Sequence, residues 1–334
     1  MNTTPRSKPA KTTREQVTLE FPDNRLLAAL CGGHARHFVR IEQRLRVRIN
    51  MRGNIVVIEG EPDLREQAAT VLRALYARLE GGEDIGLAEV DAEIRFASHA
   101  HPDLPAQEFG VPQIRTAAGR ITRTRSPAQS AYLDLMRTHP LVFGVGPAGT
   151  GKTFLAAAFG AHLLYERRIE RLILSRPALE AGERLGFLPG DLREKIDPYL
   201  RPLYDALFDV IGEQVTRLME QGTIEVAPLA FMRGRTLRRA FVILDEAQNC
   251  SSAQMRMFLT RLGEDSRMVV CGDTTQSDLP SGRAEGLEEA LQRLNEVEGV
   301  AIAHFLDRDV VRHPLVTRIV RAYEQAAKSG KAEP

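Results

Sequence analysis

Tryptophan is absent from this chain of 334 residues, and cysteine, aromatic residues and net charge are all sparse. Three scattered cysteines, Cys31, Cys250 and Cys271, exclude a disulfide framework or a zinc knuckle, so we expect reduced thiols and a cytoplasmic protein. No run of about 18 apolar residues occurs, so we expect no membrane-spanning helix. The net charge of +1 gives no global attraction to polyanions, so any contact with nucleic acid must come from a local basic surface.

The composition that remains is that of an ordinary globular protein, with 43% apolar and 27% charged residues, and the length favours two domains. The first residues, MNTTPRSKPAKTTR, lack the apolar centre of a secretory signal. We therefore interpret residues 1–15 as a disordered basic arm, and residues 326–334 as a flexible tail.

A glycine-rich segment fits the pattern G-x-x-x-x-G-K-[ST]: Gly146, Pro147, Ala148, Gly149, Thr150, Gly151, Lys152 and Thr153. It follows the apolar run 141–145 and precedes a helix-forming run, which is the context that a phosphate-binding loop requires. Backbone N–H groups would converge on the phosphates, Lys152 would reach the β and γ oxygens, and the Thr153 hydroxyl would ligate Mg²⁺. The sequence therefore predicts binding of ATP with Mg²⁺, against the alternative of a chance turn.

A second buried run, Phe241 to Leu244, ends in Asp245 and Glu246, as in a Walker B segment. We expect Asp245 to hold the Mg²⁺ shell and Glu246 to polarise the attacking water. This pairing favours hydrolysis over phosphoryl transfer to a small molecule. The alternative is a pair of solvated carboxylates at the end of a strand.

Two glutamines complete the candidate site. Gln276 ends the G-D-x-x-Q pattern after the apolar run 268–271, where it would bond the γ-phosphate, unless Asp273 and Gln276 only cap a turn. Gln129 precedes the phosphate loop by one helix and would read the adenine edge, with Tyr132 stacking nearby. The alternative for this pair is a helix cap and an ordinary core tyrosine.

Short apolar runs alternate with helical segments through residues 126–325. The runs are Leu141 to Val145, Leu172 to Leu174, Ile224 to Val226, Phe241 to Leu244, Met268 to Cys271 and Ala301 to Phe305. Fully apolar short strands separated by helices predict an α/β fold with a largely parallel sheet covered on both faces. The phosphate loop then lies at the carboxyl end of the first strand, where such sheets bind ligands.

Residues 16–81 have the predicted order β-α-α-β-β-α and resemble a KH RNA-binding module. The turn that corresponds to its GxxG reads Gly32, Gly33, His34 and Ala35, so the second glycine is missing. RNA binding and a plain docking appendage therefore both stay open. Residues 82–125, which contain several prolines and end in arginines, are interpreted as a linker with a basic end.

Longer segments make the resemblance more specific. They are Ser175 to Glu183, Leu185 to Asp191, Asp197 to Asp205, Val226 to Leu229 and Met232 to Leu237. Together with the phosphate loop, D-E-A-Q and G-D-x-x-Q, they resemble the PhoH family from about residue 125 to residue 323. The resemblance implies a RecA-like P-loop ATPase core related to superfamily 1 helicases, with RNA helicase or remodelling activity in RNA metabolism.

One RecA-like domain leaves the site without a second domain to supply an arginine. We therefore expect the arginine from a neighbouring subunit, in a homo-oligomer that is most simply a hexameric ring. Arg312, in D-V-V-R-H-P, is the favoured candidate over Arg308, and a surface ion pair is the alternative. Single-stranded RNA is the expected partner. A second hypothesis is a nucleotide-switched binding module for an endoribonuclease or a ribosome-associated partner, and a metabolite kinase or a nuclease is disfavoured.

Overall fold

A computed structural model describes residues 16–98, 113–115, 121–177, 192–276, 286–311, 315–316 and 319. The chain divides into two compact units, one of residues 1–108 and 125–127 and one of residues 109–124 and 128–334. The expected basic arm and C-terminal tail lie outside the described residues. No helix in the described ranges is long and apolar enough to cross a membrane.

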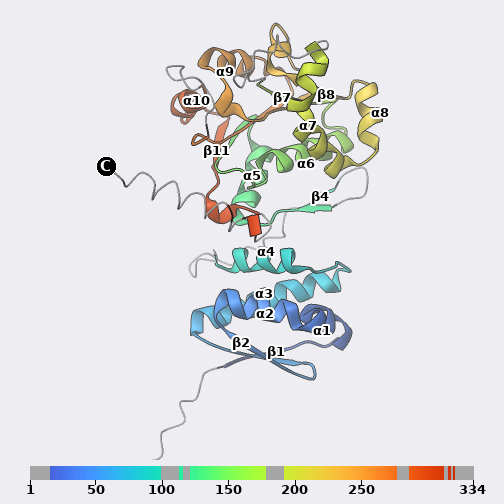
Figure 1. Cartoon of the computed structure of the whole chain (residues 1–334), viewed down its shortest axis with the longest axis vertical. Coiled ribbons are helices and arrows are strands. Elements are labelled where there is room, and N and C mark those ends of the chain that lie inside the picture. The colour runs from blue at the N-terminus through green and yellow to red at the C-terminus, as the bar shows by residue number, and fades with distance from the viewer. Residues whose placement is uncertain are drawn as a thin grey trace, which may run out of the picture. The chain divides into compact units, whose positions relative to one another are not determined.

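The N-terminal unit begins with the elements β1 (Gln16–Glu20), α1 (Asn24–Cys31), η1 (Gly33–Ala35), α2 (Arg36–Leu45), β2 (Arg48–Arg52), β3 (Ile55–Glu59) and α3 (Pro62–Glu80) (Figure 1). Its three strands form an antiparallel sheet in the order β1-β3-β2. Alternate residues of β3, Val56 and Ile58, are buried, while Asp23 caps α1 by accepting from the Arg25 and Leu26 N–H groups. The predicted order of a small α/β unit is confirmed.

Part of the segment interpreted as a linker is regular structure. Helix α4 (Leu87–Ser98) packs against α2 and α3 in the N-terminal unit. It buries Val90, Ile94 and Ala97, and Asp91 forms an ion pair with Arg40 at 3.1 Å. The apolar spacing of three and four residues in α4 explains why this segment folds onto the core. Further along, β4 (Gln113–Arg115) and β5 (Ile121–Arg123) form an antiparallel pair in the second unit.

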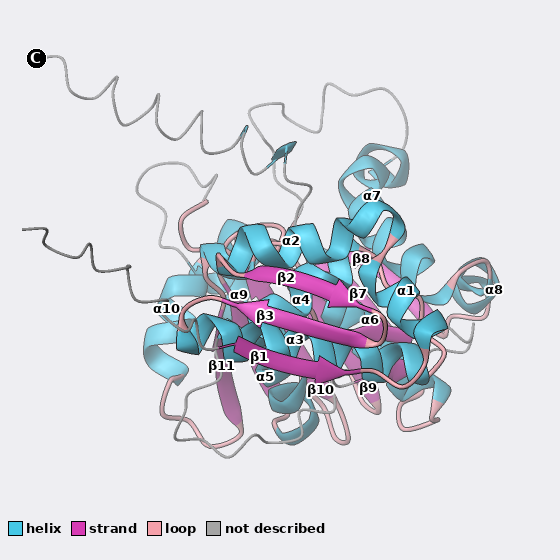
Figure 2. Ribbon diagram, turned by 90° about the horizontal axis from the view of Figure 1, so that it is seen from below, coloured by secondary structure: helices cyan, strands magenta, loops and turns pink. Residues whose placement is uncertain are grey.

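The second unit is built on a six-stranded sheet in the order β11-β6-β10-β9-β7-β8, and every adjacent pair is parallel. Its strands are β6 (Leu141–Val145), β7 (Arg171–Arg176), β8 (Ile224–Pro228), β9 (Ala240–Leu244), β10 (Arg267–Gly272) and β11 (Val300–His304). Figure 2 labels β7 to β11 and draws all strands in magenta, those of the N-terminal unit included. The helices of the second unit include α5 (Pro127–Thr138), α6 (Lys152–Tyr165), α7 (Leu192–Ile211), α8 (Gln214–Glu220), α9 (Ser252–Leu259) and α10 (Gly286–Leu294). Short helical turns are η3 (Leu229–Met232), η4 (Ala247–Asn249) and η5 (Asp307–Asp309).

Both faces of this sheet are buried. Along β9, Phe241 and Ile243 belong to one apolar core, and Val242 and Leu244 belong to another. The first core contains side chains from α5, α6 and α7, and the second contains side chains from α9 and α10. Strands that are buried on both faces read as continuous apolar runs, which is why all six predicted runs became strands of this sheet. The α/β fold class is confirmed.

Candidate nucleotide site

The glycine-rich loop joins β6 to α6 at the carboxyl edge of the parallel sheet. Gly146 has φ 141° and Gly151 has φ 83°, both in the region that favours glycine. A Cβ on Gly146 would lie 2.2 Å from the carbonyl oxygen of Phe305, so the residue after β11 approaches the loop too closely for any side chain at this position. The Val311 N–H also donates to the Gly149 carbonyl at 2.9 Å, so the segment after β11 holds the loop directly.

Lys152 begins α6 with its side chain largely buried. Its Nζ donates to the carbonyl oxygens of Gly146 at 2.6 Å and Pro147 at 2.8 Å. Burial lowers the pKa of Lys152, and the carboxylates of Asp273 and Asp245 act in the opposite direction. The ammonium therefore lies inside the loop, where a phosphate oxygen would compete with these carbonyls for it.

Asp245, at the end of β9, meets the first turn of α6. The Thr153 hydroxyl donates to Asp245 Oδ1 at 2.5 Å, although 92 residues separate the two in sequence. Burial raises the pKa of Asp245, and the hydrogen bond from Thr153 counteracts this effect. The contact forms because β9 and β6 are parallel, with only β10 between them, so their carboxyl ends share one edge.

These oxygens fit a magnesium ion. Mg²⁺ in nucleotide sites takes one or two protein oxygens together with phosphate oxygens, and Thr153 and Asp245 supply a hydroxyl and a carboxylate. Asp273 Oδ2 is a third oxygen at this edge, buried and without a hydrogen-bond partner among the described residues. The described residues contain no group of three or more His, Cys, Asp or Glu side chains arranged to hold a metal. Thr153 and Asp245 are therefore the residues that would hold the ion.

Glu246 follows Asp245 in a left-handed backbone conformation, with φ 51°. Both of its carboxylate oxygens are engaged. Oε1 forms an ion pair with Arg176 at 3.2 Å, and Oε2 accepts from Gln248 Nε2 at 2.5 Å. A non-glycine residue in this conformation costs about 1–3 kcal/mol and persists where the surrounding structure enforces it. The strained backbone and the two partners give the Glu246 carboxylate a defined orientation.

Gln248 extends this network to the next strand. Its Oε1 accepts from the backbone N–H of Asp273 at 3.1 Å, just beyond β10. Asp273 in turn accepts from the Thr275 N–H at 3.0 Å and holds the turn that leads to Gln276. Gln276 is exposed, and its contact with the γ-phosphate stays a prediction. Sequence reasoning missed the role of Gln248, although its place in D-E-A-Q was the available signal.

Gln129 contacts the phosphate loop, whereas Tyr132 lies in the apolar core. The Gln129 Nε2 donates to the Thr150 carbonyl at 2.9 Å, so it braces the phosphate loop from α5. Its predicted contact with adenine is not tested. Tyr132 is fully buried, its hydroxyl lies 3.4 Å from Cys271 Sγ, and its ring packs edge-on against Phe305. Tyr132 is therefore a core residue, as the alternative interpretation held, and does not face a nucleotide.

Of the two candidate arginines after β11, the structure describes only Arg308. Arg308 lies in η5 and is exposed. Arg312 lies outside the described residues, and its role as a finger stays a prediction. It follows Val311 in sequence, the residue that bonds to the phosphate loop.

Basic residues of the N-terminal unit are partly committed to internal contacts. Arg40 and Arg44 both pair with Asp91 of α4, at 3.1 and 3.6 Å, whereas Arg36 and Arg46 are exposed. In the turn that corresponds to GxxG, His34 and Ala35 both have φ 56°, and Gly33 and His34 are exposed. The turn keeps a distinct backbone shape without the second glycine, and RNA binding there stays a prediction.

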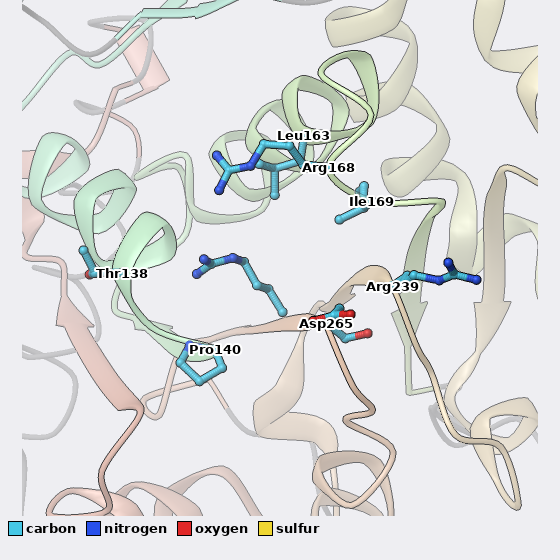
Figure 3. Close-up of a pocket in the computed structure, with 9 residues that line it drawn as sticks. Thr138, Pro140, Leu163, Arg168, Ile169, Arg239 and Asp265 are labelled. Carbon is cyan, nitrogen blue, oxygen red and sulfur yellow. The ribbon is translucent and has the colours of Figure 1, made fainter.

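A cavity of about 390 Å³ lies at the opposite edge of the six-stranded sheet (Figure 3). Its lining comes from the segments that precede β6, β7, β9 and β10, and it includes Arg168, Arg239, Asp265 and Arg267. Arg267 Nη1 donates to the Met136 and His139 carbonyls at 3.0 and 3.1 Å, so it caps the end of α5. Because the phosphate loop follows the other ends of these strands, this cavity is not part of the nucleotide site.

The fold and the site together define a P-loop nucleotide-binding protein. A parallel sheet places a G-x-x-x-x-G-K-T loop, a threonine hydroxyl, an aspartate and an adjacent glutamate at one edge. This arrangement has the residues that P-loop NTPases use to hold phosphates and to position water.

Comparison with known proteins identifies the family. Residues 121–324 match the family model described as "PhoH-like protein". A PhoH-like protein of Bacillus subtilis is 45% identical over 308 residues, covering 92% of this chain and 96% of that protein, and one of Synechocystis is 43% identical, covering 95% and 97%. The chain belongs to the PhoH-like family, and its second unit is a P-loop ATPase core of RecA-like fold, as the resemblance implied.

Two further matches cover less of the chain. Protein PhoH of Escherichia coli is 48% identical over 202 residues, covering 60% of this chain and 57% of that protein. Among solved structures, the Pif1 helicase from Candida albicans matches 54% of this chain and 39% of its own, at 14% identity and a TM-score of 0.29.

Proposed function

We propose that this protein is an ATPase that hydrolyses Mg²⁺-bound ATP and is stimulated by single-stranded RNA, acting as an RNA-remodelling factor. The observation that supports the hydrolytic part is the position of Glu246, adjacent to the proposed metal ligand Asp245 and held by Arg176 and Gln248. A glutamate beside the metal aspartate suits activation of water. The N-terminal β-α-α-β-β-α unit, which has the order of a KH module, supports RNA as the ligand.

Each residue of the site would have a separate role in binding or hydrolysis. Backbone N–H groups and Lys152 bind the phosphates, while Thr153 and Asp245 hold the ion. Bound Mg²⁺ would neutralise phosphate charge. Glu246 accepts a proton from the attacking water, and its orientation depends on Gln248, whose Oε1 accepts from Asp273 N–H. Gln129 would hold the phosphate loop in place through its hydrogen bond to the Thr150 carbonyl.

The proposed mechanism includes a further cation on the γ-phosphate. We propose that Arg312 of a neighbouring copy supplies it, in a homo-oligomeric ring that is most simply a hexamer. An arginine finger contributes about 10³ to 10⁵ in rate, so turnover should depend on assembly. An endoribonuclease or ribosome-associated protein is the expected further partner.

A second function is favoured by one observation, the engagement of both Glu246 oxygens by Arg176 and Gln248. A glutamate held in this way would turn over slowly until the ion pair is released. In that case the protein acts as a nucleotide-dependent switch, and ATP changes the surface that it offers to a protein partner.

Steady-state ATP hydrolysis distinguishes these functions. Wild type, Glu246→Gln and the matched surface control Glu264→Gln are assayed with and without a single-stranded oligouridylate, and light scattering gives the mass in the same buffer. We expect RNA stimulation in wild type and in the control, and a loss of about 10²- to 10⁴-fold in kcat for Glu246→Gln with ATP binding retained. A slow rate that RNA does not change would refute the RNA-stimulated function and support the switch.

A further inference from the structure

An exposed phenylalanine stands at the same edge of the sheet as the nucleotide site. The turn η3 follows β8 directly, so it lies at the carboxyl edge. Leu229 and Met232 are buried at 1% and 0% exposure, whereas Phe231 between them is 53% exposed. The buried neighbours anchor the turn, so Phe231 is presented to solvent on a fixed backbone.

The two arginines after this turn have different roles. Arg235 donates to both carboxylate oxygens of Glu225, at 2.6 and 2.7 Å, and its own carbonyl accepts from Arg261 at 2.9 Å. Arg233 is exposed and forms no ion pair with a described residue. Gly234 between them, with φ 77°, provides the turn that separates the two side chains. Arg235 therefore braces the segment, and Arg233 is available for a ligand.

Positive charge predominates around Phe231. Turn η3 packs against α9, whose Arg256 is exposed and likewise has no ion pair with a described residue. Neither η3 nor α9 contains an acidic residue, and the acid of β8, Glu225, is taken up by Arg235. An exposed aromatic side chain on the same pair of elements as exposed arginines suits a ligand that has both a flat face and negative charge.

We propose that Phe231 and Arg233, with Arg256 nearby, form a contact for single-stranded RNA. The ring would stack on an unpaired base, and the Arg233 guanidinium would bind an adjacent phosphate. Stacking needs the open face of a base, which a duplex does not offer, and it tolerates every base. This proposal rests on the proposed function and assigns the RNA contact to particular residues of the ATPase unit.

The same contact is connected to the catalytic glutamate. From Glu246 the chain runs through η4 directly into α9, and α9 packs against η3. An RNA strand bound to Phe231 and Arg256 would therefore contact η3 and α9. Only a short segment of chain connects α9 to Glu246. We expect that RNA bound here raises the rate of hydrolysis, and that loss of the ring removes this stimulation while basal turnover stays.

Binding of a fluorescein-labelled oligouridylate, followed by anisotropy, tests the assignment on the full chain. We compare wild type with Phe231→Ala, Phe231→Tyr and Arg233→Ala, and use Tyr165→Ala as a control. Tyr165 is 59% exposed at the end of α6, at the opposite edge of the sheet. Phe231→Ala should weaken binding about 5- to 150-fold, the equivalent of about 1–3 kcal/mol per stacked base, and Phe231→Tyr should restore it.

Arg233→Ala should lower the slope of log affinity against log salt by about one, since one phosphate contact is lost. Basal ATP hydrolysis should be equal in all variants, and circular dichroism should show equal folded content. If wild type binds RNA and Phe231→Ala binds it equally well, the assignment is overturned while the proposed function stands. If wild type binds no RNA and RNA does not stimulate its ATP hydrolysis, both the proposed function and the proposed RNA contact are refuted. Loss of a protein partner in Phe231→Ala with unchanged RNA binding would also overturn the assignment.

Discussion

Substitution of Gly146 by alanine tests the close approach between the phosphate loop and β11. The added Cβ would lie 2.2 Å from the Phe305 carbonyl oxygen and 2.9 Å from its carbonyl carbon. Phe305 has little freedom to move, since its N–H donates to the Val145 carbonyl at 2.7 Å and its buried ring packs against Tyr132. The backbone of the loop or of β11 therefore has to shift.

The expected cost follows from two contributions. Overpacking of a well-ordered core costs about 1–3 kcal/mol, and an alanine in a sparsely populated region of positive φ costs about 1–3 kcal/mol. Gly146→Ala should therefore lower the free energy of unfolding by about 2–6 kcal/mol. Gly222→Ala is the matched control, because Gly222 has φ 70° and nothing within 4 Å of its Cβ position. The control should lose only about 1–2 kcal/mol.

Urea denaturation followed by far-ultraviolet circular dichroism measures both losses, since the chain has no tryptophan to report by fluorescence. Binding of a fluorescent ATP analogue measures the function of the loop. Nucleotide affinity should fall at least about tenfold in Gly146→Ala, because Lys152 bonds to the carbonyl of this residue at 2.6 Å. Equal stability losses in the two variants, with normal nucleotide binding in Gly146→Ala, would refute the reasoning.

Three further predictions concern the metal, the thiols and the assembly. Thr153→Ala should raise the Mg²⁺ concentration needed for half-maximal ATP hydrolysis about tenfold, and Thr153→Ser should not, as a Mg²⁺ titration of the rate will show. Burial raises the pKa of Cys250 and Cys271 from 9.0 to about 12, so the stability they contribute is complete below pH 9 and is lost as the pH rises toward 12. The free energy of unfolding should fall by up to about 1.4 kcal/mol per pH unit for each thiol, and Cys250→Ala should show a shallower fall in urea titrations at pH 8 and pH 10. Mixing Arg312→Ala with Glu246→Gln should restore ATP hydrolysis above that of either variant if the arginine acts on a neighbouring subunit, and no recovery contradicts action in trans.

Local patterns were sufficient to predict the strands and the phosphate loop. A strand buried on both faces has to be apolar throughout, so runs such as 241–244 are visible in the sequence, and the loop is a contiguous motif. Helix α4 was missed even though Val90, Ile94 and Ala97 have the spacing of a buried helical face. The prolines that follow in residues 102–112 were given more weight than this periodicity, which led to the linker interpretation.

Contacts within the site depend on strand order, which sequence patterns do not specify. The bond from the Asp273 N–H to Gln248 Oε1 exists because β10 is adjacent to β9, and no spacing in the sequence indicates this. The left-handed backbone of Glu246 is also set by tertiary contacts, since glutamate has no intrinsic preference for that region. The ion pair of the Glu246 carboxylate with Arg176 was therefore beyond prediction, although the role of Glu246 as a candidate base was not.

The position of β10 gives the site a physical route from phosphate to base. This strand lies between β6, which leads to Lys152, and β9, which leads to Glu246. Asp273 at its end contacts both sides: burial lowers the pKa of Lys152 and the charge of Asp273 opposes this effect, while the Asp273 N–H donates to Gln248 Oε1. One side chain, Gln248, lies between the backbone of Asp273 and the carboxylate of Glu246. Gln248 thus connects the turn after β10 to the carboxylate of Glu246 through hydrogen bonds of 3.1 and 2.5 Å.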